Sequence, residues 1–301
     1  MKLNKKILGM VAALTANVIF GFSFIFSKSA LQFAQPIVVL AIRFTVAFLA
    51  LNLLLLTGKI KLDFKNKPKG KLLIMGIAQP LLYFIFELYG LSLVSSAFSG
   101  VIISLVPVGV IILSTLFLKE RPSIIQWICT VVSISGVSAM SILSNDGAEN
   151  KALGVFLLLG AVICAAVFNV LSRGESKRFS PFERTYIMFL LGAVGFNTLA
   201  LAMLGKEYIS SIVSAVSEPQ FLLSIGYLAV LSSVGAFLLY NFSTSVITAT
   251  RSASFSNIIT VVTVLAGVII LKEKFSIWEY ILCAVIILGV WGVNYFTSDN
   301  K

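Results

Sequence analysis

Ten long apolar segments, separated by short charged or turn-rich clusters, constrain this chain more than any other feature of its sequence. A helix of about 20 apolar residues crosses the hydrocarbon core of a bilayer. The segments lie at residues 7–28, 35–56, 71–94, 97–118, 123–143, 153–172, 182–204, 219–246, 250–271 and 276–297. They occupy nearly all of the 301 residues, and a connection such as Thr57 to Gly70 is too short for a soluble domain. The sequence therefore predicts an all-α integral membrane protein with ten transmembrane helices.

Composition supports a lipid environment and argues against a nucleic-acid partner. The chain is 58% hydrophobic and 12% charged, with a mean hydropathy of +1.02, whereas soluble domains carry about 25% charged residues. The net charge of +11 would suit nucleic acid, but the lysines lie in loops between apolar helices, where they determine topology. We expect the lipid bilayer as a partner and no nucleic acid.

The distribution of lysine and arginine predicts the orientation. If the amino terminus is inside, most of the 23 basic residues fall in inside loops, and the outside connections hold Lys28, Lys151, Lys206, Lys272 and Lys274. Positive charge resists translocation, so both termini are predicted to lie in the cytoplasm. We expect the protein in the plasma membrane. The first apolar run is longer than the 7 to 15 residues usual for a signal peptide, and we expect an uncleaved first span.

Cysteine and histidine usage gives no reason to expect a metal ion or another cofactor. Cys129, Cys164 and Cys283 lie inside apolar segments without paired spacing, and the sequence has no histidine. A phosphate-binding loop of the Gly-x-x-x-x-Gly-Lys-Ser/Thr kind is also absent from the sequence. Any transport is therefore predicted to be secondary, driven by a gradient or by exchange.

The chain aligns with itself in two blocks. A shift of 145 residues superposes three landmarks of the first two spans on the sixth and seventh, namely Gly9 on Gly154, Lys28 on Arg173 and Pro36 on Pro181. A shift of 153 superposes Leu118-Lys119-Glu120 on Leu271-Lys272-Glu273, Ser123 on Ser276 and Gly136 on Gly289. We predict two five-helix repeats, residues 1–147 and 148–301. An odd number of spans in each repeat inverts the second relative to the first, as in many secondary transporters.

These features together resemble a known family, the EamA-type drug/metabolite transporters. The resemblance covers nearly the full chain and rests on the five-plus-five arrangement and on short motifs: Phe20-Gly21-Phe22-Ser23-Phe24, Ile42-Arg43-Phe44, Pro107, and Leu118-Lys119-Glu120-Arg121 repeated as Leu271-Lys272-Glu273-Lys274. Phe20 stands where many members carry tryptophan. The resemblance implies export of metabolites, amino acids or toxic compounds from a prokaryotic cytoplasm. It also implies a central cavity lined by the first, third and fourth spans and their counterparts.

Two ionisable residues lie clearly within predicted spans, Arg43 and Glu87. An ionisable side chain at membrane depth needs a partner, a wet cavity or a function. Glu87 follows Gln79 and Tyr83 at intervals of four, so the three side chains share one helix face. Two interpretations remain open: Glu87 and Arg43 form a structural ion pair, or Glu87 faces a cavity and takes part in binding or coupling.

Further polar and aromatic residues on predicted spans complete the candidate substrate-binding set. Asn169 occupies the repeat position of Phe24, and Tyr240 that of Glu87. The full set is Asn17, Phe24, Gln79, Tyr83, Glu87, Asn169, Tyr240, Ser254 and Asn257. Each Asn or Ser also has a structural interpretation, an interhelical hydrogen bond worth about 0.6 kcal/mol. Glu120 and Glu273, at span ends, are interpreted as structural, and Pro80 and Pro107 are expected to kink their helices.

The predicted function is export of small organic metabolites, such as amino acids, related compounds or drugs, by alternating access through a central cavity. A membrane-embedded enzyme is the first alternative, although the sequence offers no histidine base and no nucleophile with an evident activating partner. A channel is the second, although rings of charge and a repeated carbonyl filter are absent from the sequence. We therefore expect no enzymatic activity and leave monomer and homodimer open.

Overall fold

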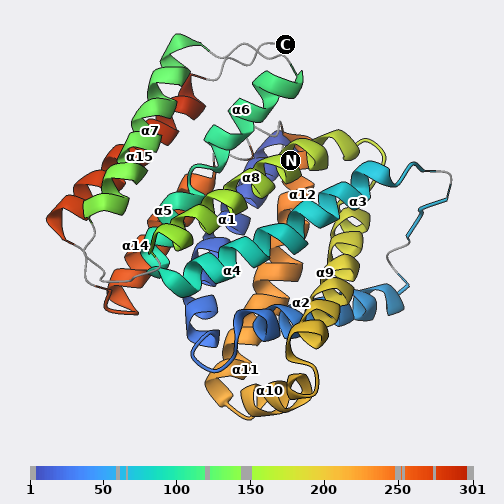
Figure 1. Ribbon diagram of the computed structural model, residues 1–301. Helices are drawn as coiled ribbons and strands as arrows, with labels where there is room; N and C mark the ends of the chain where they lie inside the picture. Colours follow the sequence, from blue (N-terminus) through green and yellow to red (C-terminus); the bar gives the residue numbers. More distant parts are fainter. Residues whose placement is uncertain are drawn as a thin grey trace.

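The computed structural model describes residues 5–58, 62–65, 67–118, 123–143, 151–247, 252, 255–273 and 276–296. All regular secondary structure within these ranges is helical (Figure 1). The elements up to residue 143 are α1 (Lys5–Ala30), α2 (Pro36–Leu56), α3 (Gly70–Gly76), η1 (Ile77–Leu82), α4 (Tyr83–Leu93), α5 (Ser96–Ile103), α6 (Val106–Leu118) and α7 (Ile124–Leu143). Those that follow are α8 (Lys151–Glu175), α9 (Pro181–Leu204), α10 (Glu207–Val216), α11 (Pro219–Gly226), η2 (Tyr227–Ala236), α12 (Phe237–Val246), α14 (Ser256–Ile269) and α15 (Ile277–Tyr295).

Many of these helices have the length and composition of membrane spans. Seven helical segments in the described part of the chain are long and apolar enough to cross a bilayer, and α7, α14 and α15 contain shorter apolar runs. Most helix ends lie within a few residues of the predicted segment ends. The all-α prediction is therefore confirmed.

Two of the long predicted segments bend where they were expected to bend. The segment from Gly70 to Leu93 contains the π-helical stretch η1, in which Pro80 lacks a backbone donor and Gln79 leaves helical geometry at φ −144° and ψ 116°. The segment from Ser96 to Leu118 is interrupted between α5 and α6, just before Pro107, the second residue of α6. The segment from Pro219 to Val246 also contains a π-helical stretch, η2. It has no internal proline, and the sequence analysis did not predict this irregularity.

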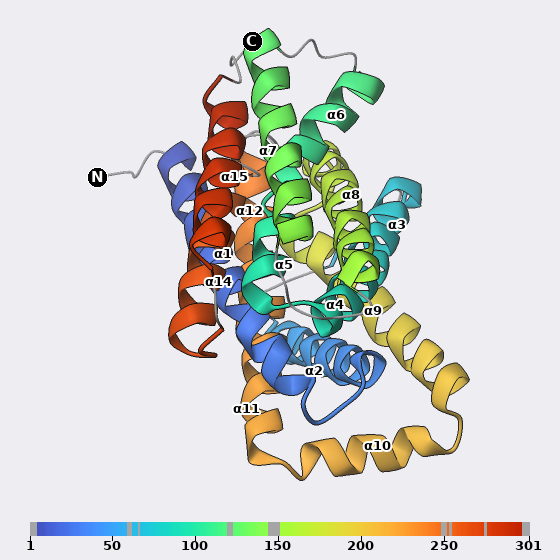
Figure 2. The same ribbon diagram turned by 60° about the vertical axis from the view of Figure 1, so that its left-hand side comes forward.

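Helices distant in sequence pack closely across the molecule. Helix α1 packs against α12 and α14, and α8 packs against α4 and α6. The close approach of α1 to α14 requires Gly21, because a Cβ atom there would lie 2.6 Å from Cβ of Val262. Helices α7 and α15 pack mainly on each other and stand together at one side of the bundle (Figures 1 and 2).

Candidate functional site

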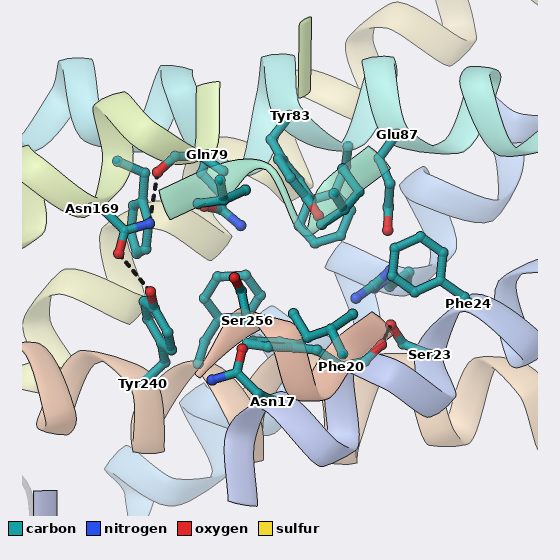
Figure 3. Close-up of a pocket in the computed structure, with 18 residues that line it drawn as sticks. Asn17, Phe20, Ser23, Phe24, Gln79, Tyr83, Glu87, Asn169, Tyr240 and Ser256 are labelled. Carbon is teal, nitrogen blue, oxygen red and sulfur yellow. Dashed lines mark hydrogen bonds between the residues drawn. The ribbon is translucent and has the colours of Figure 1, made fainter. Parts of the chain in front are cut away.

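A cavity lies at the centre of the bundle, where α1, α2, α4, α8, α12 and α14 meet. Its volume is about 60 Å³, enough for several water molecules. Its lining is mostly apolar and rich in aromatic rings, with a few polar side chains that point into the same space (Figure 3). A mostly apolar pocket with a few placed polar groups is the usual form of a small-molecule site.

Seven of the nine candidate residues line this one cavity: Asn17, Phe24, Gln79, Tyr83, Glu87, Asn169 and Tyr240. Ser254 lies outside the described residues, and so does the side chain of Asn257, whose backbone belongs to α14. The sequence pattern therefore grouped residues of five elements, α1, η1, α4, α8 and α12, that line one cavity. Their role in binding stays a prediction.

The lining also contains residues that the candidate set lacked: Phe20, Ser23, Arg43, Phe84, Phe168, Phe237 and Ser256. Phe20 could have been found, because it lies three residues after Asn17 and four before Phe24 on one face of α1. The aromatic residues of other helices gave no such signal, since phenylalanine also packs the rest of the bundle.

Arg43 projects from α2 into the wall of the cavity and is 1% exposed. Its Nε atom donates to Oγ of Ser233 at 3.0 Å, and its Nη2 atom donates to Oγ of Ser232 at 3.2 Å. The guanidinium also lies over the ring of Phe84, with Cζ 4.3 Å from the ring centroid, a favourable cation–π arrangement. Arg43 is thus held by hydroxyl groups and an aromatic face rather than by a carboxylate.

Glu87 faces the cavity from α4 and is 2% exposed. Its Oε2 atom has no hydrogen-bond partner in the described part of the chain, and no salt bridge of 4.0 Å or less joins it to Arg43 there. The structural ion pair between Glu87 and Arg43 is therefore not formed in this conformation. Two of the Arg43 donors bond serine hydroxyls instead. The cavity-facing interpretation of Glu87 is the one that the geometry supports.

Tyr240 and Asn169 form a polar contact on the opposite wall of the cavity (Figure 3). The Tyr240 hydroxyl donates to Oδ1 of Asn169 at 2.5 Å, and Nδ2 of Asn169 donates to the carbonyl of Ala165 in its own helix at 2.8 Å. Asn17 makes the same type of backbone contact, to Ala13 at 2.7 Å. These bonds fix the amides without using every polar atom of the lining.

Lys28 caps the carboxyl end of α4, one helical turn beyond the cavity residues of α1 and α4. Lys28 Nζ donates to the carbonyls of Leu91 and Val94, at 2.9 and 2.7 Å. Lys28 and Leu91 follow the cavity residues Phe24 and Glu87 by one helical turn each. A cation at the carboxyl end of α4 complements the helix dipole.

A similar arrangement is built from α8 and α12. Arg173 Nη1 donates to the carbonyl of Thr244 at 2.8 Å, and these residues follow Asn169 and Tyr240 by one helical turn each. The buried Arg184 adds bonds to Ser172, Thr244 and Asn241. One helical turn beyond the cavity residues, equivalent cations of the two predicted repeats thus cap carboxyl-terminal helix turns.

Glu273 has a structural contact of the kind expected for it. Its carboxylate accepts from the backbone N–H of Ser96 at 2.9 Å, the hydroxyl of Ser96 at 2.7 Å and the backbone N–H of Ala97 at 3.1 Å. A carboxylate at the amino terminus of α5 satisfies free backbone donors and complements the helix dipole. Glu120, its repeat counterpart, lies outside the described residues.

Comparison with known proteins decides the family. The model of the EamA-like transporter family matches the chain twice, over residues 7–142 and 152–295. The chain belongs to the EamA-like transporter family. This membership confirms the resemblance drawn from the sequence, and it makes the protein a multi-pass membrane transporter with a small-molecule substrate and the lipid bilayer as partners.

Individual EamA-like relatives match over nearly their full length. The uncharacterized transporter YcxC of Bacillus subtilis (strain 168) is 36% identical over 94% of this chain and 92% of its own. An uncharacterized transporter of Archaeoglobus fulgidus is 25% identical over 94% and 96%. One solved crystal structure superposes with a TM-score of 0.69 at 16% identity, covering 94% of this chain and 95% of that one, which shows a shared fold. Because the relatives are named as transporters, they favour transport over an enzymatic activity.

Proposed function

We propose that this EamA-like protein exports small organic solutes, with amino acids and related zwitterionic compounds as the favoured class, by alternating access through the central cavity. One observation carries the proposal: Arg43 and Glu87 lie in the lining of the same central cavity without forming an ion pair with each other. A buried carboxyl oxygen without a hydrogen-bond partner, as at Oε2 of Glu87, is destabilising. A bound solute can supply that partner.

The lining suits a solute with charges of opposite sign and an apolar body. The Glu87 carboxyl can accept hydrogen bonds from an ammonium group, and the Arg43 guanidinium can donate to a carboxylate. Aromatic rings, including Phe20, Phe168 and Phe237, form the rest of the wall and favour apolar or aromatic substituents. We accordingly assign substrate contact to the nine candidate residues together with Arg43.

Matched contacts in the two copies of the family domain support ten spans in two inverted repeats. Lys28 caps Leu91 in the first copy as Arg173 caps Thr244 in the second, at the positions related by the shifts of 145 and 153. Ser123 and Gln126 cap the start of α7 reciprocally, as Ser276 and Glu279 cap α15. We take the repeat boundaries as residues 1–147 and 148–301.

Alternating access and orientation follow from this arrangement. A cavity flanked on two sides by equivalent cation caps can widen on one side when one cap breaks, while the other cap holds. With the basic loops inside, both termini lie in the cytoplasm, the cap of Lys28 lies on the outer side and that of Arg173 on the inner side. The protein then resides in the plasma membrane and moves solutes outward.

Flux measurements in proteoliposomes test the proposal. A panel of amino acids, nucleosides and cationic drugs is offered to the purified full chain, with protein-free liposomes as the control. We expect saturable flux of one or more zwitterionic solutes and competition among them. Flux that does not saturate would indicate a channel, and transport of cationic drugs alone would contradict the zwitterionic class.

A further inference from the structure

Helix α10, between two membrane-length segments, separates apolar from polar side chains sharply. At 100° per residue, its apolar side chains fall on one arc: Tyr208, Ile209, Ile212, Val213, Ala215 and Val216. The opposite arc carries Glu207, Ser210, Ser211 and Ser214. Residues 205–218 fall between the predicted spans 182–204 and 219–246, and the sequence analysis predicted no helix there.

One side of the apolar arc is already used by the protein. Tyr208 and Ala215 are buried. The Tyr208 hydroxyl donates to Oδ1 of Asn197 at 2.6 Å, and Nδ2 of Asn197 donates to Oγ1 of Thr45 at 2.8 Å. Burial raises the pKa of the Tyr208 phenol, so it remains a neutral donor. These bonds fix α10 against α9 and α2, so its orientation is defined by the protein.

The other side of the same arc is exposed. Ile209 is 65% and Val213 is 57% exposed. Exposed apolar side chains continue onto both neighbouring helices. They are Leu201 and Met203 near the end of α9, and Leu222 and Leu223 at the start of α11. Figure 2 shows α10 lying crosswise between the last turn of α9 and the first turn of α11. Because α9 and α11 belong to membrane-length segments, their exposed leucines face lipid, and the surface of α10 extends that lipid-facing surface.

We propose that α10 is an interfacial helix whose partner is the surface of the lipid bilayer. Ile209 and Val213 insert at the boundary between headgroups and acyl chains, and the serine side of the helix faces headgroups and water. Lys206, Glu207 and Glu218 give the segment an acidic balance. The contact is therefore apolar and does not require anionic lipid.

This contact connects the bilayer to the cavity wall. Thr45, the last member of the hydrogen-bonded chain from α10, lies two residues after Arg43 on α2. Helix α11 leads directly into η2, which carries the serines that hold Arg43. In the corresponding connection after α2, the described residues 62–65 and 67–69 contain no helix. Among the described residues, a connecting helix of this kind therefore follows α9 but not α2.

Depth measurements on single cysteines test this assignment in the full-length protein. Cys129, Cys164 and Cys283 are first replaced by alanine, and V213C and S214C are made separately in that background. Each protein is labelled with a fluorophore and reconstituted into phosphatidylcholine vesicles. Adjacent positions on one helix serve as matched controls, because they differ in face but not in location. Gel filtration and thermal unfolding show whether each variant is folded.

We expect brominated lipid to quench the label at position 213 several-fold more than the label at 214, and aqueous iodide to show the reverse order. The pattern should be the same when a third of the lipid is phosphatidylglycerol. Equal iodide quenching at both positions would overturn the proposal, since α10 would then lie in water. Protection from both quenchers at position 213 would overturn it in favour of a protein contact. Brominated-lipid quenching that appears only with anionic lipid would overturn the apolar mode of contact.

Discussion

Arg43 on α2 donates a hydrogen bond of 3.0 Å to the hydroxyl of Ser233 in η2, 190 residues away in the sequence. The first family domain thereby contacts the π-helical stretch of the second at the wall of the cavity. A π-helical stretch is a weaker helix that often marks a functional site. A solute that binds the Arg43 guanidinium in the cavity can therefore change the contacts of η2.

Replacement of Arg43 tests this link. We expect R43Q to reduce the apparent affinity for a zwitterionic solute by about 10- to 100-fold, because a hydrogen bond to a charged group contributes about 1.5–3 kcal/mol. R43K should recover part of the loss, since it keeps the charge but not the planar donors. Solute binding and flux in proteoliposomes measure both. K206Q, at an exposed lysine, is the control and should behave as wild type.

Replacement of Glu87 separates coupling from structure. Because no ion pair of 4.0 Å or less joins Glu87 to Arg43 among the described residues, E87Q should leave thermal stability unchanged or raised. If Glu87 carries the driving proton, the same change should abolish the pH dependence of transport, since glutamine keeps the shape but does not titrate. E207Q, at an exposed carboxylate, is the control. Normal transport with unchanged pH dependence and lowered stability would contradict the coupling role.

The Tyr240–Asn169 contact makes a prediction about stability. Y240F removes the hydroxyl that donates to Oδ1 of Asn169 at 2.5 Å and leaves a buried acceptor without its donor. We expect a destabilisation of about 1–3 kcal/mol, seen as a lower thermal unfolding temperature in detergent. Y295F, at an exposed tyrosine, should have no measurable effect. An equal shift for both variants would show that the cavity contact contributes nothing specific.

Orientation is testable with two exposed positions on opposite predicted sides. A cysteine at Lys65 should resist an impermeant thiol reagent added to intact cells, because the surrounding lysines place this loop in the cytoplasm. A cysteine at Ser210 of α10 should react. The opposite labelling pattern would place both termini outside and reverse the proposed direction of transport.

The two caps give a paired prediction about access. K28M removes the donor to Leu91 and Val94 at the proposed outer end, and R173M removes the donor to Thr244 at the inner end. We expect K28M to increase outside labelling of a cysteine placed at Phe24, and R173M to increase inside labelling of one at Asn169. K206M, on the surface, should change neither. Increased labelling from the wrong side in either variant would contradict the assignment of the caps.

Sequence reasoning located the cavity residues wherever one helix carried a repeated interval. Gln79, Tyr83 and Glu87 share a face at steps of four, and all three line the cavity. It failed where the deciding contact came from a distant element. Nothing in the residues near Arg43 indicated that Ser232 and Ser233 would occupy its donors in place of Glu87.

Two further features were out of reach for similar reasons. The π-helical stretch η2 contains no proline from which it could have been predicted. Helix α10 was not predicted, because it has ten residues and a transmembrane helix needs about 20 apolar residues. The helix positions themselves were predictable. A long apolar segment within the bilayer forms a helix because only the helix pairs all its backbone N–H and C=O groups internally.

The exchanged packing of α1 and α8 has a consequence for how this chain acquires its structure. Gly21 of α1 meets Val262 of α14, and at the related positions Ala166 of α8 meets Gly109 of α6, so each family domain completes its interior with a helix of the other. Neither domain made alone can bury that surface. The smallest cooperative folding unit is therefore the whole chain, which should unfold in one transition rather than two, and residues 1–147 should become protease-resistant only when residues 148–301 are synthesised in the same cell.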